Sequence, residues 1–298
     1  LVAQGGKIYA NGTKDEPIIF TADEDNAKSG HWGGIIINGK APISGDKEDK
    51  SNTALAEINN KYPYGGNNAA DNSGVMTYVS ICYAGARSTQ DIEHNGLTLN
   101  GVGNGTTIEN IYVLESADDA IEFFGGTVNV KNLLAVNPDD DMFDFTQGYC
   151  GTLSNCYGIW ESDYTSTEAD PRGIEADGNF DGLYPNHLRQ SDFVVDGMTI
   201  VNNAANTTDN VDRMQDVIKI RRGAKATIKN ALVKGTGGAI DLVDMNDGKG
   251  AGNAASTISI TNSLQLTGKK LNGEAVLNEA GSNTGADTSV FGWTKYNF

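Results

Sequence analysis

Six carboxylates in two short segments form the strongest chemical pattern in this sequence. They are Asp118, Asp119 and Glu122 in the first segment, and Asp140, Asp141 and Asp144 in the second, each 22 positions later. If the segments form neighbouring strands, Glu122 and Asp144 lie about 5 Å apart, which suits the carboxyl pair of a retaining glycosidase or a shared Ca²⁺ ion. A solvated acidic face, or Asp side chains bonded to turn amides, is the simpler explanation, and we favour it.

A second oxygen-rich pattern runs from Asp177 to Gly182. Asp177, Asn179 and Asp181 alternate with other residues and a glycine follows, as at the start of a calcium-binding loop. The closing Glu of an EF-hand is absent, because Leu188 holds the twelfth position. We expect Ca²⁺ at these three residues if another loop completes the ligand shell; an Asx-rich turn is the alternative.

Aromatic side chains gather in and beside the longest insertion of the chain. Trp160, Tyr164 and Tyr184, with Tyr149 and Phe180 nearby, are candidates for a sugar-stacking platform, to which His187 and Arg189 could add polar contacts. The alternative is that the rings hold the inserted loop onto the body of the protein, with structural roles for His187 and Arg189.

The 22-residue period also identifies the elements that position these side chains. Residues 108–111 match residues 130–133, and both units are short, β-branched and aromatic, interrupted by Asn and Gly. A fixed period indicates stacked units, none of which buries its apolar face alone. No window keeps the apolar spacing of a helical solenoid, and a Greek-key sandwich does not explain the self-match. We therefore predict an all-β fold, a right-handed parallel β-helix.

One bend is expected to recur in every coil, because Asn and Gly tolerate left-handed backbone geometry. The residues assigned to that bend are Ser80, Asn110, Asn132, Asn155, Gly197, Asn230 and Asn262. We expect a single domain over residues 1–298, with larger loop insertions at about 40–73, 158–192, 202–215 and 244–256. Insertions into a solenoid usually fall on one face, which is often the working face.

Alignment of the repeats predicts which side chains point inward. One inward slot holds Ile121, Phe143, Ile174, Ile218 and Ile240, and Ile108, Val130 and Ile228 are also expected inside. Because side chains alternate along a strand, the next residue of each coil points outward. These outward residues are Glu122, Asp144, Glu175, Lys219 and Asp241. The run of carboxylates among them that begins with Glu122, Asp144 and Glu175 is called the acidic column.

Composition excludes some partners. The net charge of −17 argues against binding to nucleic acid or to an anionic membrane surface, since both need clustered Lys and Arg. It fits a soluble secreted protein or one that binds cations. No apolar run reaches membrane-spanning length, and the chain begins in mid-repeat, which indicates that a targeting segment and a first coil precede it.

Several long motifs resemble one family. They are residues 5–13, residues 32–42, the Asp-Asp-x-Ile-Glu-Phe-Phe-Gly-Gly block at 118–126 and the closing residues 292–298. They are similar to motifs of a large family of Bacteroidota surface proteins. The resemblance implies a right-handed parallel β-helix at the outer-membrane surface or outside the cell, as a lipoprotein or a type IX secretion substrate. It implies no shared activity.

Two functions remain open. The first, which we favour, is a non-catalytic surface module that binds a glycan or another surface protein, or serves as an adhesive rod; it predicts a flat, open acidic column. The second is a polysaccharide lyase or glycoside hydrolase that uses the six carboxylates, with Lys219 as a candidate base. It predicts a cleft walled by inserted loops.

Pectin-degrading hydrolases of this fold carry a His-Gly and an Arg-x-Lys after an Asp pair. Here no His precedes a Gly, and Lys219-Ile220-Arg221 reverses the basic order. These departures weaken the hydrolase interpretation.

Overall fold

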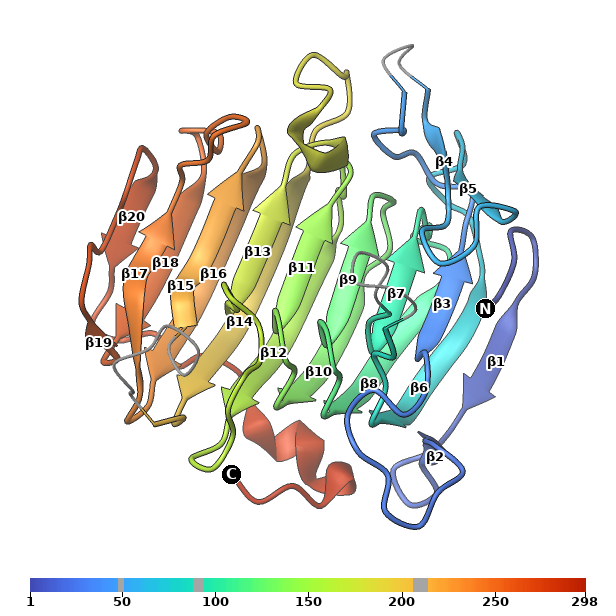
Figure 1. The fold of residues 1–298 in the computed structure, drawn as a ribbon, viewed down its shortest axis with the longest axis horizontal. Coiled ribbons are helices and arrows are strands. Elements are labelled where there is room, and N and C mark those ends of the chain that lie inside the picture. The colour runs from blue at the N-terminus through green and yellow to red at the C-terminus, as the bar shows by residue number, and fades with distance from the viewer. Residues whose placement is uncertain (48–50, 88–93, 206–213) are drawn as a thin grey trace.

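Short apolar runs separated by Asn and Gly fold into strands that stack coil upon coil. The computed structural model describes residues 1–47, 51–87, 94–205 and 214–298. Its coils follow one another along the long axis of the molecule from the blue N-terminal end to the red C-terminal end (Figure 1). Every pairing within the two large sheets is parallel, so the predicted right-handed parallel β-helix is confirmed.

Two sheets form the body of the β-helix. The ten-stranded sheet has the order β1 (Ile8–Asn11), β6 (Gly74–Cys82), β8 (Thr107–Leu114), β10 (Val130–Val136), β12 (Thr152–Trp160), β14 (Asp192–Asn202), β16 (Lys225–Lys234), β18 (Thr257–Asn262) and β20 (Val276–Glu279), with β2 (Ile18–Phe20) also paired to β6. The eight-stranded sheet has the order β19 (Gln265–Leu266), β17 (Gly238–Asp244), β15 (Met214–Arg221), β13 (Ile174–Asp177), β11 (Phe143–Thr146), β9 (Ile121–Phe124), β7 (Leu97–Asn100) and β3 (Ile35–Asn38).

Apolar side chains from both sheets fill the space between them. The rings of Phe123, Phe145 and Phe193 stack, with centroids 5.1 Å and 4.2 Å apart, and Tyr149 packs 4.4 Å from Phe123. Such offset aromatic contacts stabilise the core beyond the area that they bury. The inward residues predicted from the repeat are buried as expected, apart from Ile240.

The recurring bend is a column of residues with positive φ. Asn110, Asn132, Asn155 and Asn230 have φ between 50° and 57°, and Gly197 has φ 73°. The amide of Asn132 donates to Asn110 Oδ1, and that of Asn155 donates to Asn132 Oδ1, both at 2.9 Å. An asparagine ladder thus links the corners of adjacent coils.

Two corner assignments are wrong. In β6 the position opposite Asn110 is taken by Tyr78, with φ 51°, because Val79, and not Ser80, pairs with Ile111. Near the C-terminal end, the register between β16 and β18 shifts after Ile228, so that Asn262 pairs with Val233 and lies beyond the corner.

The register of the acidic column agrees with the repeat through β15. Asp144 pairs with Glu122 on one side and with Glu175 on the other, and Glu175 pairs with Lys219. The prediction for the next coil is wrong. Lys219 pairs with Asp244 instead of Asp241, and Ile240 is only partly buried, because β17 enters the sheet three residues out of the expected register.

Loops of two inserted segments directly follow strands of the eight-stranded sheet. Insertion 40–73 contains an antiparallel hairpin of β4 (Thr53–Leu55) and β5 (Pro63–Gly65), and insertion 158–192 contains the short 3₁₀ helix η1 (Phe180–Gly182). Both lie beyond the carboxyl ends of the strands, at the top of Figure 1. Residues 48–50 of the first insertion and 206–213 of the predicted insertion 202–215 lie outside the described residues.

The C-terminal segment packs on the outside of the ten-stranded sheet. It contains the 3₁₀ helix η3 (Thr288–Thr294), whose Phe291 and Trp293 cover Tyr112, Leu134 and other outward apolar residues of β8 and β10. No helix in the described parts of the chain is long and apolar enough to span a membrane.

Candidate functional site

A cleft of about 420 Å³ lies over the eight-stranded sheet, within the size range of ligand pockets. Its floor comes from β3, β7, β9, β11, β13 and β15. Asp46, Leu55 and Tyr64 of insertion 40–73 form one wall, and Phe180 and Asp181 of insertion 158–192 form another. The inserted loops therefore stand on the face that carries the acidic column, and this column lies in a cleft instead of on the flat, open face expected of a non-catalytic module.

The two loops also touch each other. The hydroxyl of Tyr184 donates to the carbonyl of Asp46 at 3.0 Å, and Nε2 of His187 lies 2.9 Å from the carbonyl of Ser51. Arg189 donates from Nε to the carbonyl of Gly148 at 2.8 Å. Tyr184, His187 and Arg189 thus hold the loops in place, and none of them lines the cleft.

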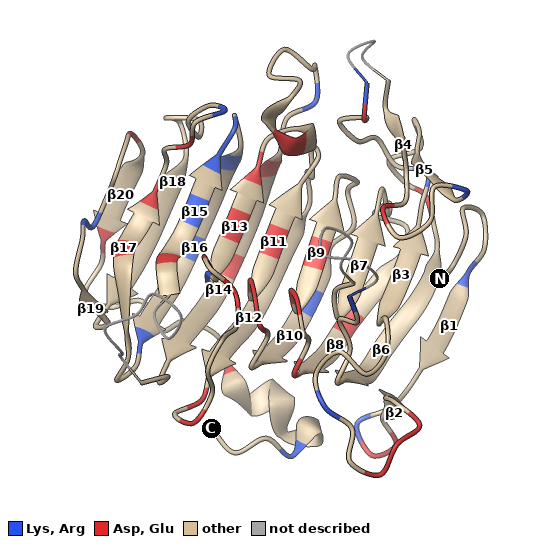
Figure 2. Cartoon of the chain, in the orientation of Figure 1, with Lys and Arg blue, Asp and Glu red and all other residues tan. Residues whose placement is uncertain are grey.

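Three carboxylates from successive strands face the cleft. Glu122 on β9, Asp144 on β11 and Glu175 on β13 are adjacent in register, and Figure 2 shows the red bands that they form across these strands. Asp119, Glu122 and Asp144 each place one oxygen within 4.8 Å of the others. Carboxylate oxygens at this spacing could bind a divalent cation or act as an acid–base pair.

The remaining acidic residues of the predicted cluster lie beside this column and do not line the cleft. Asp118, Asp119 and Asp140 bring their oxygens within 4.8 Å of one another at the turns before β9 and β11. The backbone N–H of Asp141 donates to Asp119 Oδ1 at 2.9 Å. The repeated Asp therefore links one turn to the next, as in the simpler explanation of this pattern.

The acidic column is held in a state that favours protonation. Burial, and then the neighbouring charge of Asp144, raise the pKa of Glu122 well above its usual range. Burial, and then Glu175, do the same to the pKa of Asp144. Asn95 opposes the shift at Glu122, because its amide donates to Oε2 at 2.6 Å. The two groups can therefore share a proton or accept a cation.

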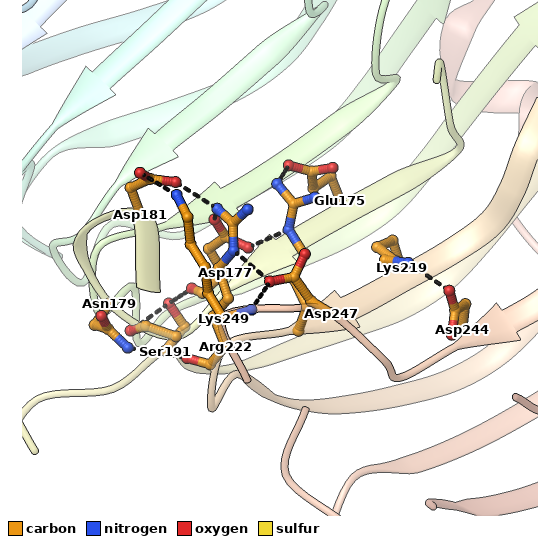
Figure 3. A network of polar contacts seen from close by, with 12 residues as sticks. Glu175, Asp177, Asn179, Asp181, Ser191, Lys219, Arg222, Asp244, Asp247 and Lys249 are labelled. Carbon is orange, nitrogen blue, oxygen red and sulfur yellow. Dashed lines mark hydrogen bonds and ion pairs between the residues drawn. The ribbon is translucent and has the colours of Figure 1, made fainter. Parts of the chain in front are cut away.

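The other end of the cleft carries arginines that are already paired. Glu175 forms ion pairs with Arg172 and Arg221. Asp177 accepts from Arg221 Nε at 2.6 Å and from Arg222 Nη1 at 2.6 Å. Figure 3 shows the part of this network around Arg222.

The loop predicted to bind Ca²⁺ belongs to this network. Asp181 binds Arg222 at 2.7 Å and Lys249 at 2.5 Å, while the amide of Asn179 donates to the carbonyl of Arg222 at 3.0 Å. A Ca²⁺ ion at Asp177, Asn179 and Asp181 would have to displace these arginine and lysine contacts. Calcium binding at this loop stays a prediction.

Lys219, the candidate base, lies outside the cleft. It pairs with Asp244 and lies 3.6 Å from Asp216, although its strand position is adjacent to Glu175. Its ammonium group is therefore held by one carboxylate of its own strand, Asp216, and by one of the neighbouring strand β17, Asp244.

The predicted aromatic platform is not exposed. Trp160 is 1% exposed and donates from Nε1 to the carbonyl of Pro138 at 2.8 Å, and Tyr164 donates to Asp139 Oδ1 at 3.0 Å. These two rings hold insertion 158–192 onto the β-helix, which is the alternative weighed from the sequence.

Three aromatic side chains line the cleft, Tyr64, Phe124 and Phe180. Phe180 was among the aromatic candidates of the longest insertion, whereas Tyr64 and Phe124 were missed. Phe124 lies two residues after Glu122 and so shares its face, which alternation along the strand could have indicated. Tyr64 packs edge-on against Phe124 with centroids 6.4 Å apart, a contact between an insertion and a strand that no local pattern reveals.

Comparison with known proteins gives a family and no individual relative. Residues 1–295 match the model of a pectate-lyase-like β-helix domain. No curated protein and no solved structure matches the chain. Since the match spans nearly the whole sequence and the fold is a parallel β-helix, the chain belongs to the pectate-lyase-like β-helix family.

Proposed function

We propose that this protein is a glycan-binding β-helix module that acts outside the cell, and that the glycan lies along the cleft over β3 to β15. The observation that carries the proposal is the cleft itself, a groove across successive coils with walls from two inserted loops. A rigid solenoid with inserted loops on one face is a common way to build a binding surface.

The side chains of the cleft suit a sugar. Sugar hydroxyls need donors and acceptors, and the floor supplies polar side chains at the spacing of the strands: Asn95, Thr98, Asn100, Thr146 and Gln147. Apolar sugar faces need aromatic partners, and Tyr64, Phe124 and Phe180 line the same cleft. The hydroxyl of Tyr64 is fixed by Gln147 Oε1 at 2.8 Å, so that its ring has a defined orientation.

Glycoside hydrolysis is a second candidate, favoured by the walled cleft, which was expected of an enzyme from the sequence, and by the carboxyl pair within it. Oxygens of Glu122 and Asp144 approach within 4.8 Å, and burial raises the pKa of both groups, so that one can remain a proton donor while the other is ionised. A pair this close fits a retaining mechanism better than an inverting one. A lyase reaction needs a base. Arg221, a cationic side chain that lines the cleft, is already bound by Glu175 and Asp177.

A glycan array combined with assays for reducing ends and unsaturated products tests both functions on the same polysaccharides. We expect binding that weakens roughly tenfold in Phe124→Ala, about the energy of one aromatic contact, and that is unchanged in Tyr9→Ala, whose exposed ring lies on β1 of the ten-stranded sheet, outside the cleft. Turnover that disappears in Glu122→Gln would establish hydrolysis. Failure of every glycan to bind would overturn the proposal.

A further inference from the structure

Charge is divided unevenly along the cleft. Its lining contains seven carboxylates and two guanidiniums. Both guanidiniums, Arg221 and Arg222, belong to the end near β15, where they bind Glu175, Asp177 and Asp181. The positive charge of the cleft is therefore already balanced by its own carboxylates, and the end near β9 has an excess of negative charge.

The end near β9 lacks a counter-charge. Within the described ranges, neither Glu122 nor Asp144 forms an ion pair with a Lys or Arg. Asp144 Oδ1 is buried and has no hydrogen-bond partner there. Beneath it, Asp141 is 2% exposed, its Oδ1 also has no hydrogen-bond partner, and its carboxylate lies within 4.8 Å of Asp144 and Glu175. This buried negative charge behind the pair has no ion-paired cation of its own in the described part of the chain, so a ligand that brings a positive group to the cleft-facing carboxyl groups of Glu122 and Asp144 gains electrostatic energy.

Resting on the glycan-binding function proposed above, we infer that the cleft is selective for an amino-sugar glycan, whose protonated amine binds between Glu122 and Asp144. An ammonium group has three donors and no acceptor, which matches carboxylate oxygens on two adjacent strands. The aromatic and amide side chains beside the pair can contact the rest of the sugar.

The same charges disfavour a polyuronate. Each uronate unit would bring a carboxylate to a cleft whose two arginines are engaged. The uronate carboxylates and the carboxylates of the cleft would repel one another unless a cation lay between them. The chain thus shares its fold with the pectate-lyase-like family but has a cleft whose charge suits the opposite kind of sugar.

Calorimetric titration with three oligosaccharides of equal length tests the inference. The probes are oligomers of glucosamine, of N-acetylglucosamine and of galacturonate, titrated at several pH values between about 5 and 7, because the amines lose their charge as the pH rises whereas the raised pKa of Glu122 and Asp144 delays the ionisation of these carboxyl groups. We expect glucosamine oligomers to bind at least roughly tenfold more tightly than the acetylated ones, the effect of one hydrogen bond to a charged group. We expect the preference to fall as salt is added.

Matched variants assign the preference to the pair. Glu122→Gln/Asp144→Asn should abolish the difference between the first two probes, and Glu122→Gln alone should reduce it. Glu109→Gln/Asp196→Asn removes the same two charges from exposed positions of β8 and β14 and should leave the difference intact.

Each other outcome contradicts the inference in a distinct way. Equal or tighter binding of the acetylated oligomer would overturn the amine site and leave glycan binding standing. Tightest binding of galacturonate, alone or only with added Ca²⁺, would overturn it in favour of an anionic ligand. If none of the three probes binds and no glycan on the array binds, both proposals are overturned.

Discussion

Glu122 and Asp144 are carboxylic groups that the fold shields from water and places beside one another. Their raised pKa has two causes, burial first and neighbouring carboxylates second. Other charged or polar groups that influence the two are Glu57, Asp118, Asp140, Glu175, Asp177, Arg221 and Asn95. Because most of these are acidic, the folded protein holds on to protons that the unfolded chain releases near pH 4.

This proton uptake predicts how stability depends on pH. A carboxyl group whose pKa is raised by folding favours the folded state at low pH, and this contribution is lost as the pH rises from about 4 through the raised pKa. We expect the melting temperature to fall between pH 5 and pH 8 in the native protein. Glu122→Gln/Asp144→Asn should melt higher than the native protein at pH 8 and show a flatter profile.

The control for this effect is Glu109→Gln/Asp196→Asn, which removes the same number of negative charges from the chain. Differential scanning calorimetry over the pH range compares the three proteins. If both double variants flatten the profile equally, the effect comes from overall charge, and the cleft pair has no special role.

At the scale of single strands and corners, the asparagine ladder is the element that links one coil to the next. Asn132 adopts φ 57° and shares hydrogen bonds of 2.9 Å with Asn110 and Asn155. Asn132→Ala should destabilise the protein by about 2–3 kcal/mol, because alanine disfavours this backbone conformation and forms neither hydrogen bond. Asn132→Gly should cost only about 1 kcal/mol, since glycine accepts positive φ.

Chemical denaturation measures both changes, with Lys131→Ala, at an exposed neighbouring position, as the control. If the alanine variant is as stable as the glycine variant, the left-handed bend at Asn132 contributes nothing to the free energy of unfolding.

The repeat predicted the strand register of the acidic column from β9 through β15, including the two coils that carry insertions. Asp144 and Glu122 are one 22-residue period apart and lie in neighbouring strands, so the acidic column followed directly from the sequence. The prediction failed for Ile240, Ser80 and Asn262, because near these residues coil length varies and several alignments place an apolar residue inward. Local matching cannot choose between such alignments without the partner strand.

At the scale of the whole molecule, the cleft depends on segments that are far apart in the sequence. Tyr184 reaches Asp46 and His187 reaches Ser51, across more than 130 residues. No periodicity describes such contacts, which is why the sequence suggested a flat acidic face. Likewise, the partners of Asp177 and Asp181 are arginines and a lysine from later coils, which a loop motif does not reveal.

The contact between the two loops can be tested by removing one hydroxyl. Tyr184→Phe deletes the hydrogen bond to Asp46 and should loosen insertion 40–73, at a cost of about 1 kcal/mol. We expect faster cleavage near the β4–β5 hairpin in limited proteolysis, with a melting temperature close to that of the native protein. Tyr62→Phe removes a hydroxyl from the exposed end of the same hairpin and should leave the cleavage rate unchanged; equal rates in both variants would contradict a bridging role for Tyr184.

The most direct test of glycan binding in the cleft is a crystal structure with the tightest-binding oligosaccharide from the array. We predict that the sugar lies over β9 and β11, between the β4–β5 hairpin and η1, with its ring against Phe124 and its polar groups at Glu122 and Asp144. An oligosaccharide bound on the ten-stranded sheet, or anywhere outside the cleft, would contradict this account.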